Sequence, residues 1–271
     1  MGGIAESGGA GALSGRSLPD GARKQGFVIP VYNHGKAVGG VVKELKELGL
    51  PIIMVDDGSD GETKEALEKI RAEAPLVVLV RLSKNGGKGA AVSAGLEKAF
   101  ELGLTHVLQI DADGQHDCGR AGFFLEESAT HPEAVICAYP EYDDTVPSGR
   151  RSGRKIANTW TKIVTLSPEI IESMLGFRVY PVERVCRLCR KHRLDSRMGF
   201  DIEILIRLYW EGVSFIFHPV RVMYPADGIS HFRVVRDNLR ISWVYTRLCC
   251  GMLVRLPLLL GRVIKRGMKH G

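Results

Sequence analysis

The sequence predicts an α/β domain in which a mostly parallel central sheet is flanked by helices. Between residues 26 and 138, short apolar segments rich in β-branched residues alternate with segments of helical length. Polar clusters follow four of these apolar segments, as ligand-binding loops do at the carboxyl ends of parallel strands. The composition is 45% hydrophobic and 25% charged, which is ordinary for a globular domain with a sizeable core.

The predicted strands and helices alternate regularly over the first half of the chain. The predicted strands are Phe27–Val31, Ile52–Val55, Leu76–Val80, His106–Ile110 and Ala134–Ala138. The predicted helices between them lie near Ala37–Leu48, Glu62–Glu73, Gly89–Leu102 and Arg120–Thr130. Short apolar strands that alternate with helices favour a parallel sheet covered on both faces.

The pattern changes after Ala138. The chain continues with a polar loop Tyr139–Gly153, a helix near Arg154–Thr165, a loop ending at Arg178, helices near Pro181–Lys191 and Phe200–Trp210, a strand Ser214–Met223 and a loop Tyr224–His231. This second half is too short to form an independent domain comfortably. We therefore expect residues 26–231 to form one domain with a shared site.

The two ends of the chain differ from this domain. Residues 1–25 are rich in glycine, serine and alanine without apolar periodicity, which predicts a disordered extension. This extension lacks the apolar core of a signal peptide, so we expect a cytoplasmic protein. Residues 232–271 contain nine lysines and arginines and one acid, Asp237, within a chain of formal net charge +6.

The basic C-terminal segment 232–271 is amphipathic. Its stretch Ile241–Ile264 contains tryptophan, tyrosine and many aliphatic residues, but three arginines and Pro257 make it a poor bilayer span. It predicts one or two segments lying at a membrane surface, with the arginines on anionic headgroups. This favours peripheral membrane association over a nucleic-acid partner. The alternative is a C-terminal helix packed on the core.

The six cysteines do not predict a metal site. Cys186 and Cys189 have the spacing of half a zinc site and lie near His192. No second pair exists to complete the site, and the segment is predicted to be helical. We expect these cysteines to be reduced thiols with a structural role.

Acidic residues follow the predicted strand His106–Ile110. In an extended chain the side chains of Asp111 and Asp113, separated by Ala112, project to the same side. Two clustered carboxylates with a nearby carboxamide, Gln115, suit a hard divalent ion such as Mg²⁺ or Mn²⁺. Such an ion most often serves the phosphates of a substrate.

Three other predicted strand ends carry polar clusters that should open on the same edge of the sheet. They are Pro30-Val31-Tyr32-Asn33, Asp56-Asp57-Gly58-Ser59 and Asn85-Gly86-Gly87-Lys88-Gly89. A buried aspartate can accept a hydrogen bond from a base, a lysine at a helix start can pair with phosphate, and the glycines allow close approach of a ligand. Each cluster alone is also ordinary turn chemistry. Four together predict a nucleotide–metal site, and neither a dinucleotide-binding fingerprint nor a P-loop motif is present.

The series VIPVYN, VDDGS, NGGKG and DADGQ, in this order and spacing, resembles glycosyltransferase family 2 with the GT-A fold. The resemblance is strongest to the dolichyl-phosphate mannose synthase and polyprenyl-phosphate glycosyltransferase branch and runs from about Gly26 to His231. It implies that the first three clusters bind a nucleotide-diphosphate sugar through Pro30, Tyr32, Asn33, Asp56, Asp57, Gly58, Ser59, Asn85, Lys88 and Gly89, together with Asp111, Ala112 and Asp113. Asp111, Asp113 and Gln115 would hold the metal.

In the second half of the chain, the resemblance implies residues that would bind the acceptor. Arg154 and Asn158 match the segment in which relatives bind a lipid phosphate with Arg and Ser, so Asn158 departs from that pattern. Arg178 ends a Gly-Phe-Arg motif. Ser230 matches a closing loop in which relatives have Lys where this chain has His231.

The resemblance implies an inverting transfer of sugar to a lipid-linked acceptor such as a polyprenyl phosphate. Lys88 and the metal bound at Asp113 would neutralise the leaving diphosphate. A phosphate acceptor is already anionic, whereas a hydroxyl acceptor needs a carboxylate base, for which Asp201 or Glu203 is the candidate. Asp201 could instead cap its helix.

Two alternatives belong to other functional classes. The DADG motif is similar to the signature of haloacid-dehalogenase-type phosphatases, in which Asp111 would be the nucleophile. However, that motif normally follows the first strand of the domain. The second alternative is a non-catalytic nucleotide-binding protein.

Overall fold

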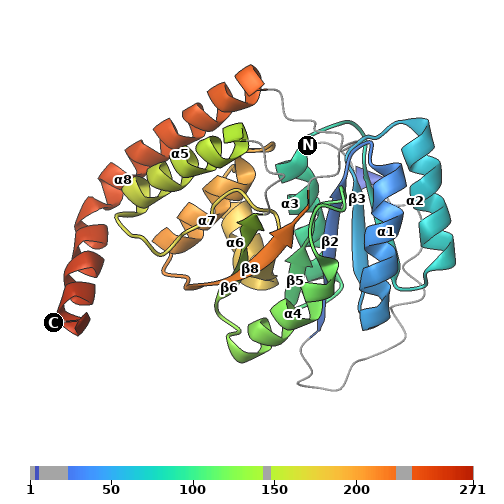
Figure 1. Ribbon diagram of the computed structural model, residues 1–271, viewed down its shortest axis with the longest axis horizontal. Coiled ribbons are helices and arrows are strands. Elements are labelled where there is room, and N and C mark those ends of the chain that lie inside the picture. Colours follow the sequence, from blue (N-terminus) through green and yellow to red (C-terminus); the bar gives the residue numbers. More distant parts are fainter. Residues whose placement is uncertain (1–3, 6–23, 143–147, 224–233, 271) are drawn as a thin grey trace.

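The computed structural model describes residues 4–5, 24–142, 148–223 and 234–270, and its strands form a single eight-stranded sheet (Figure 1). The strands are β1 (Ile4–Ala5), β2 (Gln25–Val31), β3 (Ile52–Asp56), β4 (Val77–Leu82), β5 (His106–Gln109), β6 (Val135–Tyr142), β7 (Arg178–Pro181) and β8 (Phe215–Val222). Their order in the sheet is β1-β4-β3-β2-β5-β7-β6-β8. β2 to β5 are mutually parallel, which confirms the predicted parallel half.

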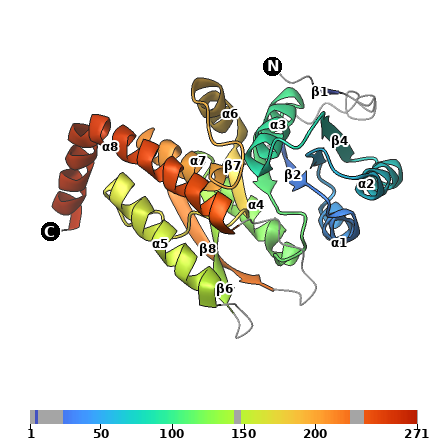
Figure 2. The same cartoon turned by 90° about the horizontal axis from the view of Figure 1, so that it is seen from above.

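The helices cover both faces of the sheet (Figure 2). They are α1 (Gly35–Leu45), α2 (Gly61–Glu73), α3 (Lys88–Glu101), α4 (Ala121–Thr130), α5 (Ser148–Thr165), α6 (Val182–Lys191), α7 (Phe200–Trp210) and α8 (Val234–His270). Two hydrophobic cores result, one under α1, α2 and α4 and the other under α3 and α5 to α8. Strand side chains alternate between them: Phe27 and Ile29 face one core, and Val28 faces the other.

The short strand β7 was not predicted from the sequence. It lies antiparallel between β5 and β6, with Leu108 opposite Val179 and Cys137 opposite Arg178. The segment has only four residues and includes an arginine and a proline, so it lacks the apolar run by which the other strands were recognised. The expectation of a loop ending at Arg178 is therefore wrong, because the polar residue begins a strand.

The loop predicted for Tyr139–Gly153 is shorter in the structure. β6 continues to Tyr142, because it pairs in parallel with β8 up to the pair Tyr142 and Val222. α5 begins at Ser148, six residues before the predicted Arg154, in a turn without apolar residues to mark it. The spacing of apolar residues in the sequence predicts neither a strand extended by a distant partner nor a helix that begins with polar residues.

In the N-terminal segment 1–25, Ile4–Ala5 forms a two-residue strand antiparallel to the edge strand β4. The remaining residues of that segment up to 23 lie outside the described residues, so the expectation of disorder stays a prediction. The predicted loop Tyr224–His231 lies entirely outside the described residues. No helix of the described residues is long and apolar enough to cross a bilayer.

The C-terminal segment forms the long helix α8, which contains Pro257. Its inner face packs on α5 and α7 through Ile241, Val244, Tyr245 and Leu248, all of which are buried. The hydroxyl of Tyr245 donates to the carbonyl of Ala157 in α5, at 2.7 Å. The alternative of a helix packed on the core therefore describes this inner face.

Arginines of α8 contact the protein, which corrects the prediction that they point to lipid headgroups. Arg240 Nε lies 2.6 Å from Asp195, and Arg262 donates to the carbonyl of Tyr209 at 2.8 Å. Arg247 lies 2.8 Å from the fully buried Glu203. The charges compensate acids and helix carbonyls that burial would otherwise leave without partners.

Glu203 is an anchor between α7 and α8. Its carboxylate accepts hydrogen bonds from Arg207, Arg247 and the backbone N–H of Asp195. These contacts fully engage Glu203 in holding α8 against the domain.

Replacing Glu203 with alanine should lower the free energy of unfolding by about 3 kcal/mol, because the partners keep their buried charge without compensation. Urea denaturation measures this loss. The matched control is Glu183→Ala, which removes the exposed pair with Arg187 in α6 and should cost less than about 1 kcal/mol. Equal losses in the two variants would show that the buried carboxylate does not anchor α8.

Candidate active site

The four predicted strand ends meet at one edge of the sheet. β2 and β3 pair up to Val31 and Asp56, and β4 extends the same register with Arg81 beside Asp56. β5 lies on the other side of β2, with Gln109 opposite Val28. Because the strands are parallel, the loops after all four open in the same direction. This arrangement was predicted from the sequence.

Asp57 fixes the glycine-rich loop before α3. Its two carboxylate oxygens accept the backbone N–H groups of Gly86 and Gly87, at 2.7 and 2.8 Å. Burial raises the pKa of Asp57, and the two N–H groups act in the opposite direction. The side chain thus joins the ends of β3 and β4 and shapes a loop whose backbone can approach a ligand.

A second set of bonds joins the loop after β2 to the loop between β3 and α2. The Asn33 N–H donates to the Ser59 hydroxyl at 3.1 Å, and the Asn33 carboxamide oxygen accepts from the N–H of Asp60 at 2.9 Å. Asp56 accepts the N–H of Ser59 at 2.8 Å. Asn33 has a φ of 54°, in the left-handed region that asparagine tolerates better than most residues. The alternative interpretation, ordinary turn chemistry, is correct for these contacts. They also rigidify this edge of the sheet.

The other predicted nucleotide-binding positions line this edge. Pro30 and Tyr32 are half-buried at the end of β2, and Ala112 is buried beside Asp111. A side chain at Gly89 would meet the carbonyl oxygen of Asp195 at 2.4 Å, so the glycine is required for packing against the segment before α7.

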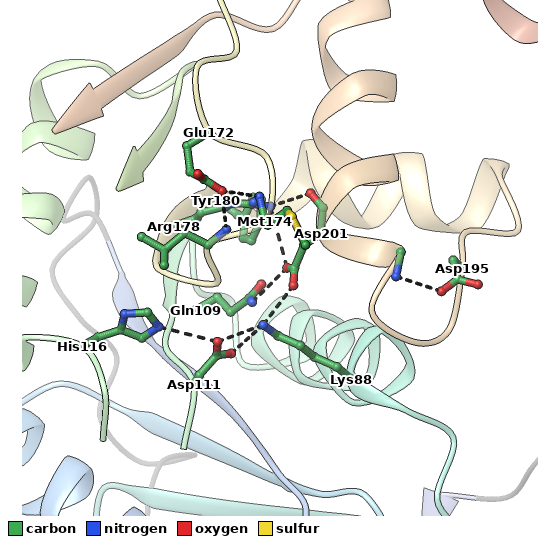
Figure 3. Close-up of polar contacts among 12 residues, drawn as sticks. Lys88, Gln109, Asp111, His116, Glu172, Met174, Arg178, Tyr180, Asp195 and Asp201 are labelled. Atoms are coloured by element: carbon green, nitrogen blue, oxygen red, sulfur yellow. Dashed lines mark hydrogen bonds and ion pairs between the residues drawn. The ribbon is translucent and has the colours of Figure 1, made fainter. Parts of the chain in front are cut away.

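Lys88 joins the two halves of the domain (Figure 3). Its Nζ lies 2.7 and 2.9 Å from the two oxygens of Asp111, after β5, and 2.9 Å from Asp201 in α7. Burial alone would lower the pKa of Lys88, but the two carboxylates hold it well above its usual range. Burial likewise opposes ionisation of Asp111, yet Lys88 and His116 hold the pKa of that carboxyl well below its usual range.

Asp201 is not a helix cap. The N-cap of α7 is Gly199, and the carboxylate of Asp195 accepts the N–H groups of Arg197 and Gly199 instead. Asp201 is 3% exposed and turned toward the site, where it accepts from Gln109 at 3.2 Å and from Lys88. The structure therefore favours the site role that the sequence left open.

Arg178 lies beneath this cluster. It is fully buried, donates to the backbone carbonyl of Asp201 at 2.7 Å, and lies 3.7 Å from the Asp201 carboxylate. It also donates to the hydroxyl of Tyr180. The resemblance implied that Arg178 binds the acceptor. In the structure Arg178 has no exposed surface and instead positions Asp201.

The predicted metal ligands occupy the loop after β5. Asp113 accepts the N–H of Gln115 at 3.0 Å, so these two residues belong to one tight turn. Within the described residues no group of three or more His, Cys, Asp or Glu side chains is arranged to hold a metal. The donor set is nevertheless the right one, because two carboxylates and a carboxamide oxygen are ligands that Mg²⁺ and Mn²⁺ accept. The residues fit a hard divalent ion, and a cation, the Lys88 ammonium, already compensates Asp111.

The predicted acceptor residues hold a loop. Arg154 lies 3.1 Å from Glu172, and the carboxamide oxygen of Asn158 accepts from the N–H and hydroxyl of Ser173, at 3.1 and 3.0 Å. Glu172 in turn accepts the N–H groups of Met174 and Leu175. This loop ends at Gly176, where an added Cβ would lie 2.5 Å from Lys88 Nζ. Ser230 lies outside the described residues.

Sequence reasoning missed His116, Gln109 and Arg197. His116 Nε2 lies 3.6 Å from Asp111, and the His116 ring packs edge-on against Phe177. Arg197 donates to Asn85 at 3.1 Å and lies over Gly87. Only the adjacency of His116 to the acidic motif could have identified it, whereas Arg197 reaches the site from the loop before α7.

The model of Glycosyl transferase family 2 matches residues 27–185, which include all four strand-end clusters. The chain belongs to glycosyl transferase family 2. It is therefore a glycosyltransferase, which argues against the phosphatase alternative and confirms the resemblance inferred from the motifs. The cysteines are all free thiols, as expected.

Similar sequences include lipid-linked sugar transferases. An uncharacterized protein of Methanocaldococcus jannaschii is 35% identical over 214 residues, 75% of this chain and 90% of that protein. The polyprenol monophosphomannose synthase of Mycolicibacterium smegmatis is 27% identical over 220 residues, 79% of this chain and 82% of the relative. The UDP-N-acetylglucosamine–dolichyl-phosphate N-acetylglucosaminyltransferase of Methanococcus voltae is 34% identical over 103 residues, which are 33% of this chain and only 41% of that enzyme.

Similar structures establish the fold. The crystal structure of glucosyl-3-phosphoglycerate synthase from Mycobacterium tuberculosis with Mn²⁺ and UDP-glucose has a TM-score of 0.60 at 16% identity, covering 88% of this chain and 80% of that one. S. aureus TarS 1–349 with UDP-GlcNAc has a TM-score of 0.57 at 17% identity, covering 85% and 66%. The predicted GT-A fold of the family is thereby confirmed.

Gly58→Ala should destabilise the edge of the sheet where the four strand-end clusters meet. Gly58 has a φ of 69°, and an added Cβ would lie 2.6 Å from the backbone nitrogen of Asn85. We expect a loss of about 2 kcal/mol in unfolding free energy, from the left-handed backbone and the displaced loop, measured by urea denaturation. Gly61→Ala is the control, because a Cβ there meets nothing within 4 Å. Equal stability of the two variants would contradict this account.

Proposed function

We propose that this enzyme transfers a sugar, with inversion, from a nucleotide-diphosphate sugar to a lipid-linked acceptor of the polyprenyl-phosphate type. One observation most directly supports binding of the sugar donor: Asp57, Lys88 and Asp111 lie at a single edge of the sheet. Relatives of this chain are named for dolichyl-phosphate and polyprenol acceptors. The M. tuberculosis synthase of the same fold was crystallised with Mn²⁺ and UDP-glucose.

In this proposal, each residue at this edge of the sheet, which we call the donor edge, has a chemical role. The Asp57-bound loop would hold the nucleotide, and Lys88 would neutralise charge on the departing diphosphate. Asp111, Asp113 and Gln115 would hold Mg²⁺ or Mn²⁺, which when bound supplies further compensation of that charge.

The surroundings of Asp201 favour an acceptor that is already anionic. One carboxylate oxygen accepts from Gln109 and the other from Lys88, so neither is turned freely to a substrate hydroxyl. A general base must reach the proton that it removes. A phosphate nucleophile needs no base, only positioning by a cation such as Arg154. We therefore assign Asp201 to orientation of Lys88, with Arg178 holding Asp201 in place.

The outer faces of α5 and α8 would bring the enzyme to its lipid. The two helices lie side by side (Figure 1). The centroids of the Trp160 and Tyr245 rings are 6.3 Å apart. Their exposed apolar side chains are Ile156, Trp160 and Ile163 on α5 and Val235, Leu239, Trp243, Leu253, Val254, Leu258, Leu260, Val263 and Ile264 on α8. An apolar face of this extent on a soluble protein marks an interaction site.

A bilayer carrying anionic lipid is the occupant that fits this face. Lys155 and Lys162 lie beside the apolar residues of α5 and are exposed. Neither forms an ion pair with any residue that the structure describes. Tryptophan and cationic side chains next to aliphatic ones are the composition of interfacial helices. Attachment at the cytoplasmic face, peripheral to the membrane, is consistent with six free thiols.

The transferase activity is tested by incubating the protein and Mg²⁺ or Mn²⁺ with a panel of labelled nucleotide sugars and polyprenyl phosphate. We expect label in the lipid extract and release of nucleoside diphosphate. Asp113→Asn should lower this rate by about 100-fold, because the ion loses a charged ligand. The control Asp117→Asn, in the same loop, should retain the rate. Absence of labelled lipid with every donor would refute the proposed acceptor.

Membrane association is tested with vesicles of phosphatidylcholine and phosphatidylglycerol. The variant Ile156→Ser/Trp243→Ser/Val254→Ser should lose most vesicle co-sedimentation, because its three side chains are exposed and contribute apolar burial only on docking. Leu48→Ser, exposed on another part of the protein, is the control. If the triple variant sediments as the parent does, the face does not bind lipid, and a concentration-dependent dimer would identify a second copy as its occupant.

A further inference from the structure

Lys88 lies in the position that a cation would take between two acids. Its ammonium contacts both oxygens of Asp111 and one of Asp201, all within 2.9 Å (Figure 3). The Lys88 side chain is only 15% exposed. Gly176 closes one side, because a Cβ there would lie 2.5 Å from Nζ and 2.7 Å from the Asp111 oxygens. The pocket between the acids therefore has little room for a second cation.

The proposed function assigns roles to Asp111 and Lys88 that affect each other. It must bind the divalent ion through the oxygens that now contact Lys88, and Lys88 must act on the diphosphate. Both cannot compensate the same buried carboxylate fully, since a carboxylate oxygen that accepts an ammonium at 2.7 Å offers fewer lone pairs to a metal. The geometry thus makes the two cations competitors for one acid.

We propose that Lys88 is an exchangeable counter-ion: it neutralises Asp111 until a divalent ion takes over this carboxylate, and the released ammonium then pairs with the diphosphate of the sugar nucleotide. This inference rests on the proposed function. Asp201 keeps hold of Lys88 during the exchange, because it contacts the ammonium from α7 independently of Asp111.

Cooperative binding of ion and nucleotide follows from this exchange. An ion that arrives alone displaces a buried ammonium from Asp111 and leaves part of its charge without a partner, which is unfavourable. A diphosphate removes that penalty by accepting the ammonium. By thermodynamic linkage, the ion must strengthen nucleotide binding by the same factor. The ion alone should therefore bind weakly.

Titration of Mn²⁺, followed by electron paramagnetic resonance of the free ion, tests the exchange without turnover. In Lys88→Met, a neutral side chain of similar length, Mn²⁺ should bind about tenfold more tightly than in the parent when no nucleotide is present. The tightening of Mn²⁺ binding by saturating UDP should be large in the parent and largely lost in the variant. Lys84→Met, an exposed lysine of the same loop, should behave as the parent.

A double variant separates occupancy of Asp111 from net charge and protects the test against misfolding. Lys88→Met/Asp201→Asn removes one positive and one negative charge, so the net charge of the cluster equals that of the parent. It also avoids leaving two buried carboxylates without a cation. If Lys88 blocks Asp111, this variant should still bind Mn²⁺ more tightly than the parent in the absence of UDP.

The outcomes distinguish this inference from the proposed function. If the parent binds Mn²⁺ with UDP but both Lys88 variants bind Mn²⁺ alone no better than the parent, Lys88 is a fixed strut and the exchange is wrong. If the parent binds no Mn²⁺ with either UDP or GDP, the metal-dependent donor site fails, and the exchange fails with it. Retention of the UDP effect in Lys88→Met also overturns the exchange.

Discussion

The contact of one buried ammonium with two carboxylates holds the site together. Lys88 begins α3, Asp111 follows β5, and Asp201 belongs to α7, so a single side chain connects the parallel first half of the sheet with the later half of the chain. Without this ammonium, among the residues that the structure describes, Asp111 would keep only His116 as a nearby cationic partner and Asp201 only Arg178, at 3.6 and 3.7 Å.

The antiparallel strand β7 explains why the later half can reach the site. It pairs with β5 on one side and β6 on the other, which brings Arg178 beneath Asp201. Arg154 and Asn158, which the resemblance of the sequence motifs implied for the acceptor, hold the segment that runs into this strand. Contacts that support the candidate site therefore extend from α5 through this loop to Lys88 and Asp111.

The sequence was most informative where one local pattern determined one structure. Continuous apolar runs located β2 to β6, and polar residues after β2, β3, β4 and β5 located the edge of the sheet at which the candidate site lies. Contacts between distant segments had no such local sign. Arg197 reaches Asn85 across 112 positions of sequence, and β7 depends on partners on both sides. Asp201 was recognisable as a candidate, but its orientation depends on contacts with Gln109 and Lys88, which are distant in the sequence.

The clamping of α8 has a geometric consequence. Because Arg240 and Arg247 fasten this helix to acids of the domain, α8 is not a tether that swings at the end of the chain. A flexible tether would allow the domain many heights and orientations relative to an attached surface. A helix fixed in this way holds the exposed apolar side chains of α5 and α8 in one orientation relative to the candidate site. In the proposed membrane attachment, the fold would therefore set the height of the site above the bilayer and the depth at which an acceptor can react.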